Sequence, residues 1–101
     1  AALRQADEIL RETLEESGQN KPSTQAFAVL ADFSSAFLDG VPRYVVILRA
    51  VNASGEGTIH VRRLPQDVLE RAAERIMKET PRVYRVVYDL SAVPPAHVEW
   101  E

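Results

Sequence analysis

The chain has 101 residues, of which 46% are apolar and 27% charged, a composition typical of one small soluble globular domain. It contains no cysteine, which excludes disulfides, thiolate metal sites and a cysteine nucleophile within these residues and fits a cytoplasmic protein. With a formal net charge of −3, the chain lacks the excess of basic residues that binds nucleic acid. No apolar run is long enough to span a bilayer, so we expect neither nucleic acid nor a membrane as a partner.

The first half of the chain predicts one helix and two strands. Residues 3–17 form an amphipathic helix whose apolar stripe recurs at helical spacing and consists of Leu3, Ala6, Ile9, Leu10 and Leu14. Strands follow at 25–33 and 43–51, joined by a loop at 34–42 with an Asp39-Gly40 turn signal. Arg49 interrupts the second strand. It is either an exposed residue at a strand end or a charge held at a subunit interface or near a nucleotide.

A third strand is expected at 58–63, after a turn at 52–57. His60 has no second histidine or carboxylate at ligand spacing, which favours a surface residue over a metal ligand. Arg62 and Arg63 either contact a phosphate or end the strand in solvent. No metal site is therefore expected in this part of the chain.

The second half predicts a helix and two further strands. The helix starts at Pro65, in the first helical turn, and Pro81 ends it. Its apolar stripe, in which we expect Met77 to fill the core, consists of Val68, Leu69, Ala72, Ala73, Ile76 and Met77. Strands at 82–90 and 97–101 follow, separated by two adjacent prolines. Val98 and Trp100 share one face of the last strand, which predicts a docked chain end.

The predicted order is α-β-β-β-α-β-β. Short connections favour antiparallel pairs, and two apolar-striped helices can cover one face of the resulting sheet. We therefore expect an α+β fold, a two-layer α/β sandwich with a mainly antiparallel sheet, as a single domain over 1–101. Apolar residues left on the other face predict a two-fold homodimer that pairs through the sheet.

Five short motifs occur along the chain: QAFAVL at 25–30, LRAV at 48–51, RLP at 63–65, VLER at 68–71, and an ending with RVVYD at 85–89, PPA at 94–96 and VEWE at 98–101. In this order they resemble the C-terminal domain of glutamine-hydrolysing GMP synthase. The likeness covers nearly all of this chain but only the last part of the family's protein. It implies a dimerisation domain of an enzyme that aminates XMP to GMP with ATP and glutamine, in purine biosynthesis.

The resemblance also implies contacts with XMP. Arg85 matches the arginine that begins the family's RVVYD motif, and Val98 and Glu99 match the hydrophobic residue and the glutamate of its ending. A guanidinium binds a phosphate bidentately, and a carboxylate accepts hydrogen bonds from nucleotide hydroxyls. Alternatively, Arg85 and Glu99 form a cross-strand ion pair or lie in solvent. The family's lysine before the two prolines is Val93 here, and its threonine is His97, so we expect weakened XMP binding.

No catalytic constellation is expected, because the chain has no Gly-rich phosphate loop, paired-histidine motif or nucleophile elbow. The resemblance implies that ATP, Mg and glutamine chemistry belongs to an ATP pyrophosphatase domain and a glutaminase domain, supplied in cis or in trans. The alternative is a stand-alone, diverged and non-catalytic dimeric module for interaction or regulation. Val93 and an Asp39-Gly40 loop shorter than the family's favour that alternative.

Overall fold

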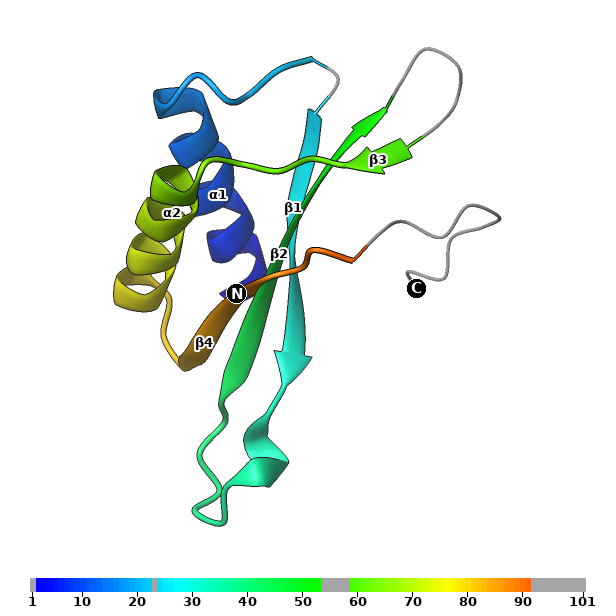
Figure 1. Ribbon diagram of the computed structural model, residues 1–101. Helices are drawn as coiled ribbons and strands as arrows, with labels where there is room; N and C mark the ends of the chain where they lie inside the picture. Colours follow the sequence, from blue (N-terminus) through cyan, green and yellow to red (C-terminus); the bar gives the residue numbers. More distant parts are fainter. Residues whose placement is uncertain (1, 23, 54–58, 92–101) are drawn as a thin grey trace.

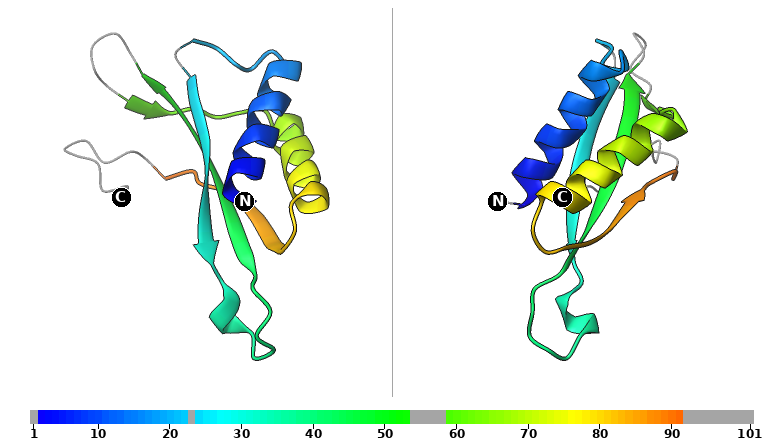
Figure 2. Two further views of the ribbon diagram at one scale, coloured as in Figure 1. Left: turned by 180° about the vertical axis from the view of Figure 1, so that it is seen from behind. Right: turned by 90° about the vertical axis from the view of Figure 1, so that its left-hand side faces the viewer.

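The computed structural model describes residues 2–22, 24–53 and 59–91 and has the predicted two-layer α+β architecture (Figure 1). The elements follow the order α1, β1, β2, β3, α2 and β4, with a short 3₁₀ turn, η1 (Ser34–Ala36), between β1 and β2. Both helices lie against the same face of the sheet (Figure 2). The fifth strand, predicted at 97–101, lies outside the described residues.

Helix α1 spans Ala2–Glu16, within one residue of the prediction at each end. Its stripe is buried as expected except for Leu3, which is 38% exposed. Thr13 is also buried, because its hydroxyl donates to the Ile9 carbonyl at 2.8 Å instead of to water. Two residues beyond the helix, Gly18 has a φ of 76°, which lets the N–H of Gln19 reach the Leu14 carbonyl at 2.8 Å and closes the helix end.

Strand β2 (Tyr44–Ala53) is the centre of the sheet. Strand β1 (Thr24–Asp32) pairs antiparallel with β2 along its whole length. Strand β3 (Ile59–Val61) pairs antiparallel with residues 51–53, and β4 (Val83–Tyr88) pairs parallel with residues 44–48. Strands β3 and β4 therefore follow one another along the second edge of β2. The sheet is mainly antiparallel, as predicted, with one parallel pair that the α2 crossover makes possible.

Helix α2 spans Gln66–Glu79, and two predictions about it are wrong in detail. Pro65 is the N-cap rather than the first helical residue, since its ψ of 144° is extended while its carbonyl already accepts the N–H groups of Val68 and Leu69. Met77 does not fill the core but is 43% exposed, because one position beyond buried Ile76 the helix surface has already turned away from the sheet.

The core lies between the helices and the sheet face made by even-numbered residues. Their side chains pack with those of α1 and α2, and they are Ala26, Ala28, Leu30, Val46, Leu48, Ala50, Val86 and Tyr88. Because neighbouring residues of a strand point to opposite faces, odd-numbered residues of the same strands face away from the helices. Residues such as Val29, Ile47 and Val87 therefore make the face of the sheet that α1 and α2 do not cover, which we call the open face.

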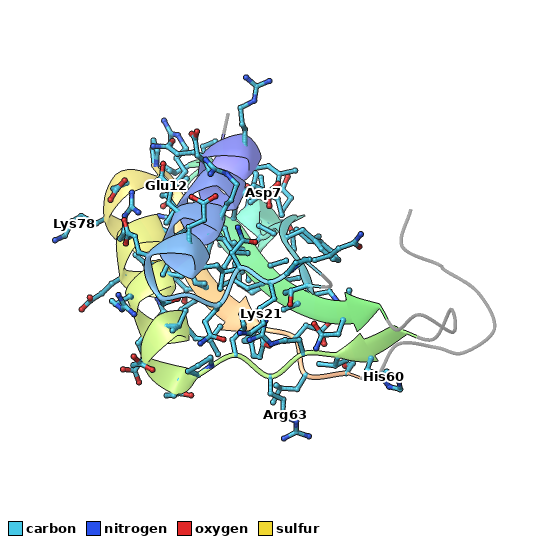
Figure 3. The ribbon with its side chains drawn as sticks, turned by 90° about the horizontal axis from the view of Figure 1, so that it is seen from above. Asp7, Glu12, Lys21, His60, Arg63 and Lys78 are labelled. Atoms are coloured by element: carbon cyan, nitrogen blue, oxygen red, sulfur yellow. The ribbon has the colours of Figure 1, made fainter. Side chains whose placement is uncertain are left out.

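Arg62 fits neither alternative proposed for it. Its guanidinium donates to the Gln19 carbonyl at 3.0 Å and to the Thr24 hydroxyl at 2.8 Å, so it fastens the end of β3 to the loop between α1 and β1. The hydroxyl of Tyr88 donates to the Arg62 carbonyl and secures the same junction from β4. Arg63, in contrast, is exposed and extends away from the body of the domain (Figure 3).

Candidate functional site

The open face of the sheet carries a row of apolar side chains. Val29, Ile47 and Val87 are neighbours across β1, β2 and β4, because Val29 pairs with Ile47 and Ile47 pairs with Val87. In the single chain Val29 is 40% exposed and Val87 is 45% exposed. Contiguous exposed apolar side chains mark interaction surfaces more often than scattered ones do. We call these three residues the apolar row.

An ion pair lies on the same face. Arg49 Nη1 is 2.8 Å from Asp89 Oδ2, and the two side chains are 9% and 23% exposed. Arg49 is therefore not an exposed strand-end residue, and that interpretation is wrong. The backbone N–H of Ser91 holds the pKa of Asp89 below its ordinary value, with help from the Ser91 hydroxyl and the Arg49 charge and against the opposing effect of burial.

Arg85, the first of the predicted site residues, is exposed on β4, which pairs only with β2 among the described strands. Its guanidinium carbon lies 4.4 Å from the centre of the Tyr84 ring, and Nη1 donates to the Tyr84 carbonyl at 2.8 Å. No carboxylate within the described ranges is bonded to it. The remaining N–H groups of this guanidinium are thus accessible to an anionic ligand.

A hollow of about 630 Å³ opens beside Arg85, between α2 and β4. Arg85 and Lys78 bring positive charge to its wall, while Glu70 and Glu74 bring negative charge. Lys78 extends from α2 away from the body of the domain (Figure 3). The charges on this wall are therefore mixed, and among them the Arg85 guanidinium is held by contacts with Tyr84.

The connection between β1 and β2 projects beyond the body of the domain (Figure 1). The Asp39 carboxylate accepts two hydrogen bonds from the Arg43 guanidinium, at 2.9 and 2.8 Å, and one from the Val41 N–H at 3.1 Å. Arg43, followed by that N–H, lowers the pKa of Asp39 to about 2. Gly40 has a φ of 73°, which confirms the turn predicted from Asp39-Gly40.

Three aromatic rings meet where this loop approaches β4. The rings of Phe33 and Tyr84 are stacked with centroids 5.8 Å apart, and Phe37 meets Tyr84 edge-on at 5.2 Å. We call these residues the aromatic cluster. Sequence reasoning missed it: the predicted elements place Phe33 at the end of the first strand and Phe37 in the loop at 34–42, and they connect neither residue with Tyr84.

The other residues of the predicted site lie outside the residues that the structure describes. They are Val98 and Glu99, together with Val93 and His97 at the positions where the chain departs from the family pattern. The convergence of Arg85 with Val98 and Glu99 therefore stays a prediction. The docked terminal strand with Trp100 also stays a prediction.

The described part of the chain contains neither a metal-binding cluster nor a membrane-spanning helix. No group of three or more His, Asp or Glu side chains there is arranged to hold a metal ion. His60 is exposed on β3, as expected for a surface residue (Figure 3). Neither helix in these ranges is long and apolar enough to cross a membrane.

Comparison with known proteins decides the family. Residues 12–100 match the family model described as GMP synthase C terminal domain. The chain belongs to this family. The resemblance seen in the motifs is thereby confirmed, since the match extends over most of the chain.

Three relatives are similar to nearly the whole of this chain. The chain is 44% identical to glutamine-hydrolyzing GMP synthase of Halothermothrix orenii, 43% identical to that of Geobacillus kaustophilus and 46% identical to that of Campylobacter fetus. Each alignment has 102 positions and covers 98% of this chain but 20% of the relative. The chain thus spans about a fifth of the length of the curated relatives that it matches.

Proposed function

We propose that this domain pairs two subunits of a glutamine-hydrolysing GMP synthase through the open face of its sheet and contributes Arg85 to the binding of XMP. The whole enzyme would aminate XMP to GMP at the expense of ATP and glutamine, in purine biosynthesis and in the cytoplasm. The domain itself would not be catalytic. Family membership supports the role, and the apolar row is the structural observation that carries the pairing.

Pairing through the sheet follows from the position of the apolar row. In a two-fold dimer the same patch of each subunit meets its copy, so the patch must be complementary to itself, as an apolar row can be. Val29, Ile47 and Val87 lie on the face without helices, and two of them keep at least 40% of their surface exposed in the single chain. A second copy seated on this face would remove that apolar surface from water.

The contact with XMP follows from the chemistry of Arg85. A guanidinium is permanently charged and forms two parallel hydrogen bonds to a phosphate. Val98 would contact the nucleotide by its apolar side chain, and the Glu99 carboxylate would accept hydrogen bonds from its hydroxyls. An ATP pyrophosphatase domain would bind ATP and Mg, and a glutaminase domain would supply ammonia, either in the same chain or in a partner chain.

Light scattering on the whole chain at micromolar concentration tests the pairing, and a dimer should have twice the 11.3 kDa mass of one chain. Val87→Glu places a charge in the apolar row and should give the monomer mass. Met77→Glu is the matched control, because Met77 is 43% exposed on α2, away from this face, and should stay dimeric. A monomeric wild type, or a dimeric Val87→Glu variant, contradicts pairing through this face.

Calorimetric titration with XMP tests the nucleotide contact. Loss of a charge-assisted hydrogen bond to phosphate costs roughly 1.5–3 kcal/mol, so Arg85→Gln should weaken binding about ten- to a hundredfold. Arg63→Gln removes an exposed arginine elsewhere on the surface and should bind like wild type. Failure of the wild type to saturate at millimolar XMP contradicts a retained site.

The second candidate function is a free-standing, non-catalytic dimeric module for interaction or regulation. The replacement of the family's lysine by Val93 favours it, because that change removes one expected phosphate contact. An immunoblot of source cells distinguishes the two functions. A band several times larger than 11.3 kDa supports a synthase subunit, whereas a band near 11.3 kDa supports the module.

A further inference from the structure

The aromatic cluster is connected to Arg85 by direct contacts. The Arg85 guanidinium lies over the Tyr84 ring at 4.4 Å, and the same group donates to the Tyr84 carbonyl at 2.8 Å. Tyr84 therefore contacts Arg85 through both its ring and its main chain. An arginine held over an aromatic face is confined to fewer rotamers than one that extends freely into water.

The Tyr84 ring is itself held from two sides by the β1–β2 connection. Phe33 stacks on it at an interplanar angle of 13°, and Phe37 meets it at 75° with centroids 5.2 Å apart. Both geometries are favourable for aromatic pairs, because the positive ring edge of one meets the negative face of the other or the rings are offset. The two phenylalanines come from residues 33–37, whereas Tyr84 is on β4, so the cluster joins segments far apart in the sequence.

The loop that carries the phenylalanines is braced at its far end. Arg43 lies over the Phe37 ring at 4.0 Å, and Asp39 holds Arg43 through two hydrogen bonds. The N–H of Phe33 donates to the Arg43 carbonyl at 2.9 Å, and the N–H of Arg43 donates to the Ser34 hydroxyl at 3.0 Å. A continuous series of contacts thus runs from the Asp39-Gly40 turn through Phe37 and Tyr84 to Arg85.

We infer that Tyr84 and Phe37 are positioning residues for Arg85, which they hold in place for the phosphate of XMP. The inference rests on the proposed function and adds to it a role for the loop between β1 and β2. A guanidinium that is ordered before binding loses less conformational freedom when the phosphate arrives, so affinity rises without any new contact to the ligand. The shortened loop then serves the site through Arg85 rather than by touching the nucleotide.

A double-mutant cycle with XMP as the probe tests the inference on the whole chain. Tyr84→Leu removes the ring and should weaken XMP binding roughly two- to fivefold, the range expected for an exposed cation–π contact. Tyr84→Phe keeps the ring and should bind like wild type. In an Arg85→Gln background, Tyr84→Leu should have no further effect, because the residue that it positions is gone. Equal weakening in both backgrounds, or no weakening in either, overturns the inference.

A measurement without nucleotide separates this inference from the proposed function. In ¹H–¹⁵N spectra the Arg85 Nε–H resonance should be ordered in wild type and in Tyr84→Phe, and it should move and lose order in Tyr84→Leu. Phe37→Leu keeps the Tyr84 ring but removes one of the two rings that hold it, and should give a smaller change in the same direction. An ordered Arg85 without XMP binding contradicts the proposed function alone, whereas an Arg85 equally mobile in wild type and Tyr84→Leu contradicts the positioning role alone.

Discussion

Arg49 and Asp89 are 40 residues apart in the sequence, yet their side chains meet with Nη1 2.8 Å from Oδ2 on the open face of the sheet. The pair joins the centre of β2 to the residue that follows β4. Its burial sets it apart from the other ion pairs of the domain, such as that of Asp67 with Arg71, whose side chains are 78% and 49% exposed. A buried ion pair is costly to break, whereas an exposed one is screened by water.

Asp89→Asn should therefore lower the free energy of unfolding by about 1–3 kcal/mol, since it removes the negative charge that faces Arg49. Asp67→Asn is the matched control and should change that free energy by less than about 0.5 kcal/mol. Urea unfolding of both variants checks this. Equal losses in the two variants would contradict a special role for the buried pair.

Stability should fall in acid. The pKa values of Asp32, Asp39 and Asp89 are below the ordinary value of 3.8, that of Asp39 at about 2. A carboxylate whose pKa is lower in the folded than in the unfolded chain stabilises the fold at any pH above its pKa in the unfolded chain. This stabilisation is lost as the pH falls through its pKa in the folded chain. The thermal midpoint should thus decrease as the pH falls from about 4 to about 2.

Asp39→Asn isolates one part of this pH dependence. The variant lacks the carboxylate whose charged form Arg43 and the Val41 N–H stabilise. Its thermal unfolding midpoint should therefore change less steeply over the same pH range. Thermal unfolding by circular dichroism at a series of pH values measures the difference. Parallel curves for Asp39→Asn and wild type would show that the Asp39–Arg43 pair does not stabilise the folded loop.

Truncation of two adjacent residues of α2 should lower the free energy of unfolding by very different amounts. Ile76 is completely buried, so Ile76→Ala should leave a cavity and lower the free energy of unfolding by about 2–5 kcal/mol. Met77 is 43% exposed, so Met77→Ala should cost less than about 1 kcal/mol. Denaturant unfolding distinguishes the two, and a large loss from Met77→Ala in the monomer would contradict the orientation of α2.

Val93 offers a gain-of-function test of the nucleotide site, and this residue is chosen from the sequence alone. Val93→Lys restores the residue type that the family carries before the two prolines and adds a charge for the phosphate. If Arg85 contacts that phosphate, XMP binding should tighten about ten- to a hundredfold, as one further charge-assisted hydrogen bond allows. Calorimetry measures the change, with Val93→Met as an uncharged control of similar length, and an unchanged affinity for Val93→Lys argues against a surviving site.

The amino-acid sequence alone determined which of the described segments become helices and strands, and it identified the family. Apolar residues recur at helical spacing in α1 and α2, and they form continuous runs in β1 and β2. These are local patterns, and a local pattern records which face of an element must be buried. The five motifs carried the resemblance for the same reason, because each of them consists of short runs of consecutive residues. Arg85 was also proposed as a site residue in this way, from the motif RVVYD.

Only the tertiary structure decided which segments meet. It set β4 parallel to β2 on the edge that β3 also uses, turned Met77 out of the core, paired Arg49 with Asp89, and brought the rings of Phe33 and Phe37 onto Tyr84. These outcomes depend on how the two helices and four strands of the described residues fill one shared volume, which no window of consecutive residues records. The periodicity of a strand specifies its two faces, but its partners, and the charges and rings that they bring, depend on the packing of the whole domain.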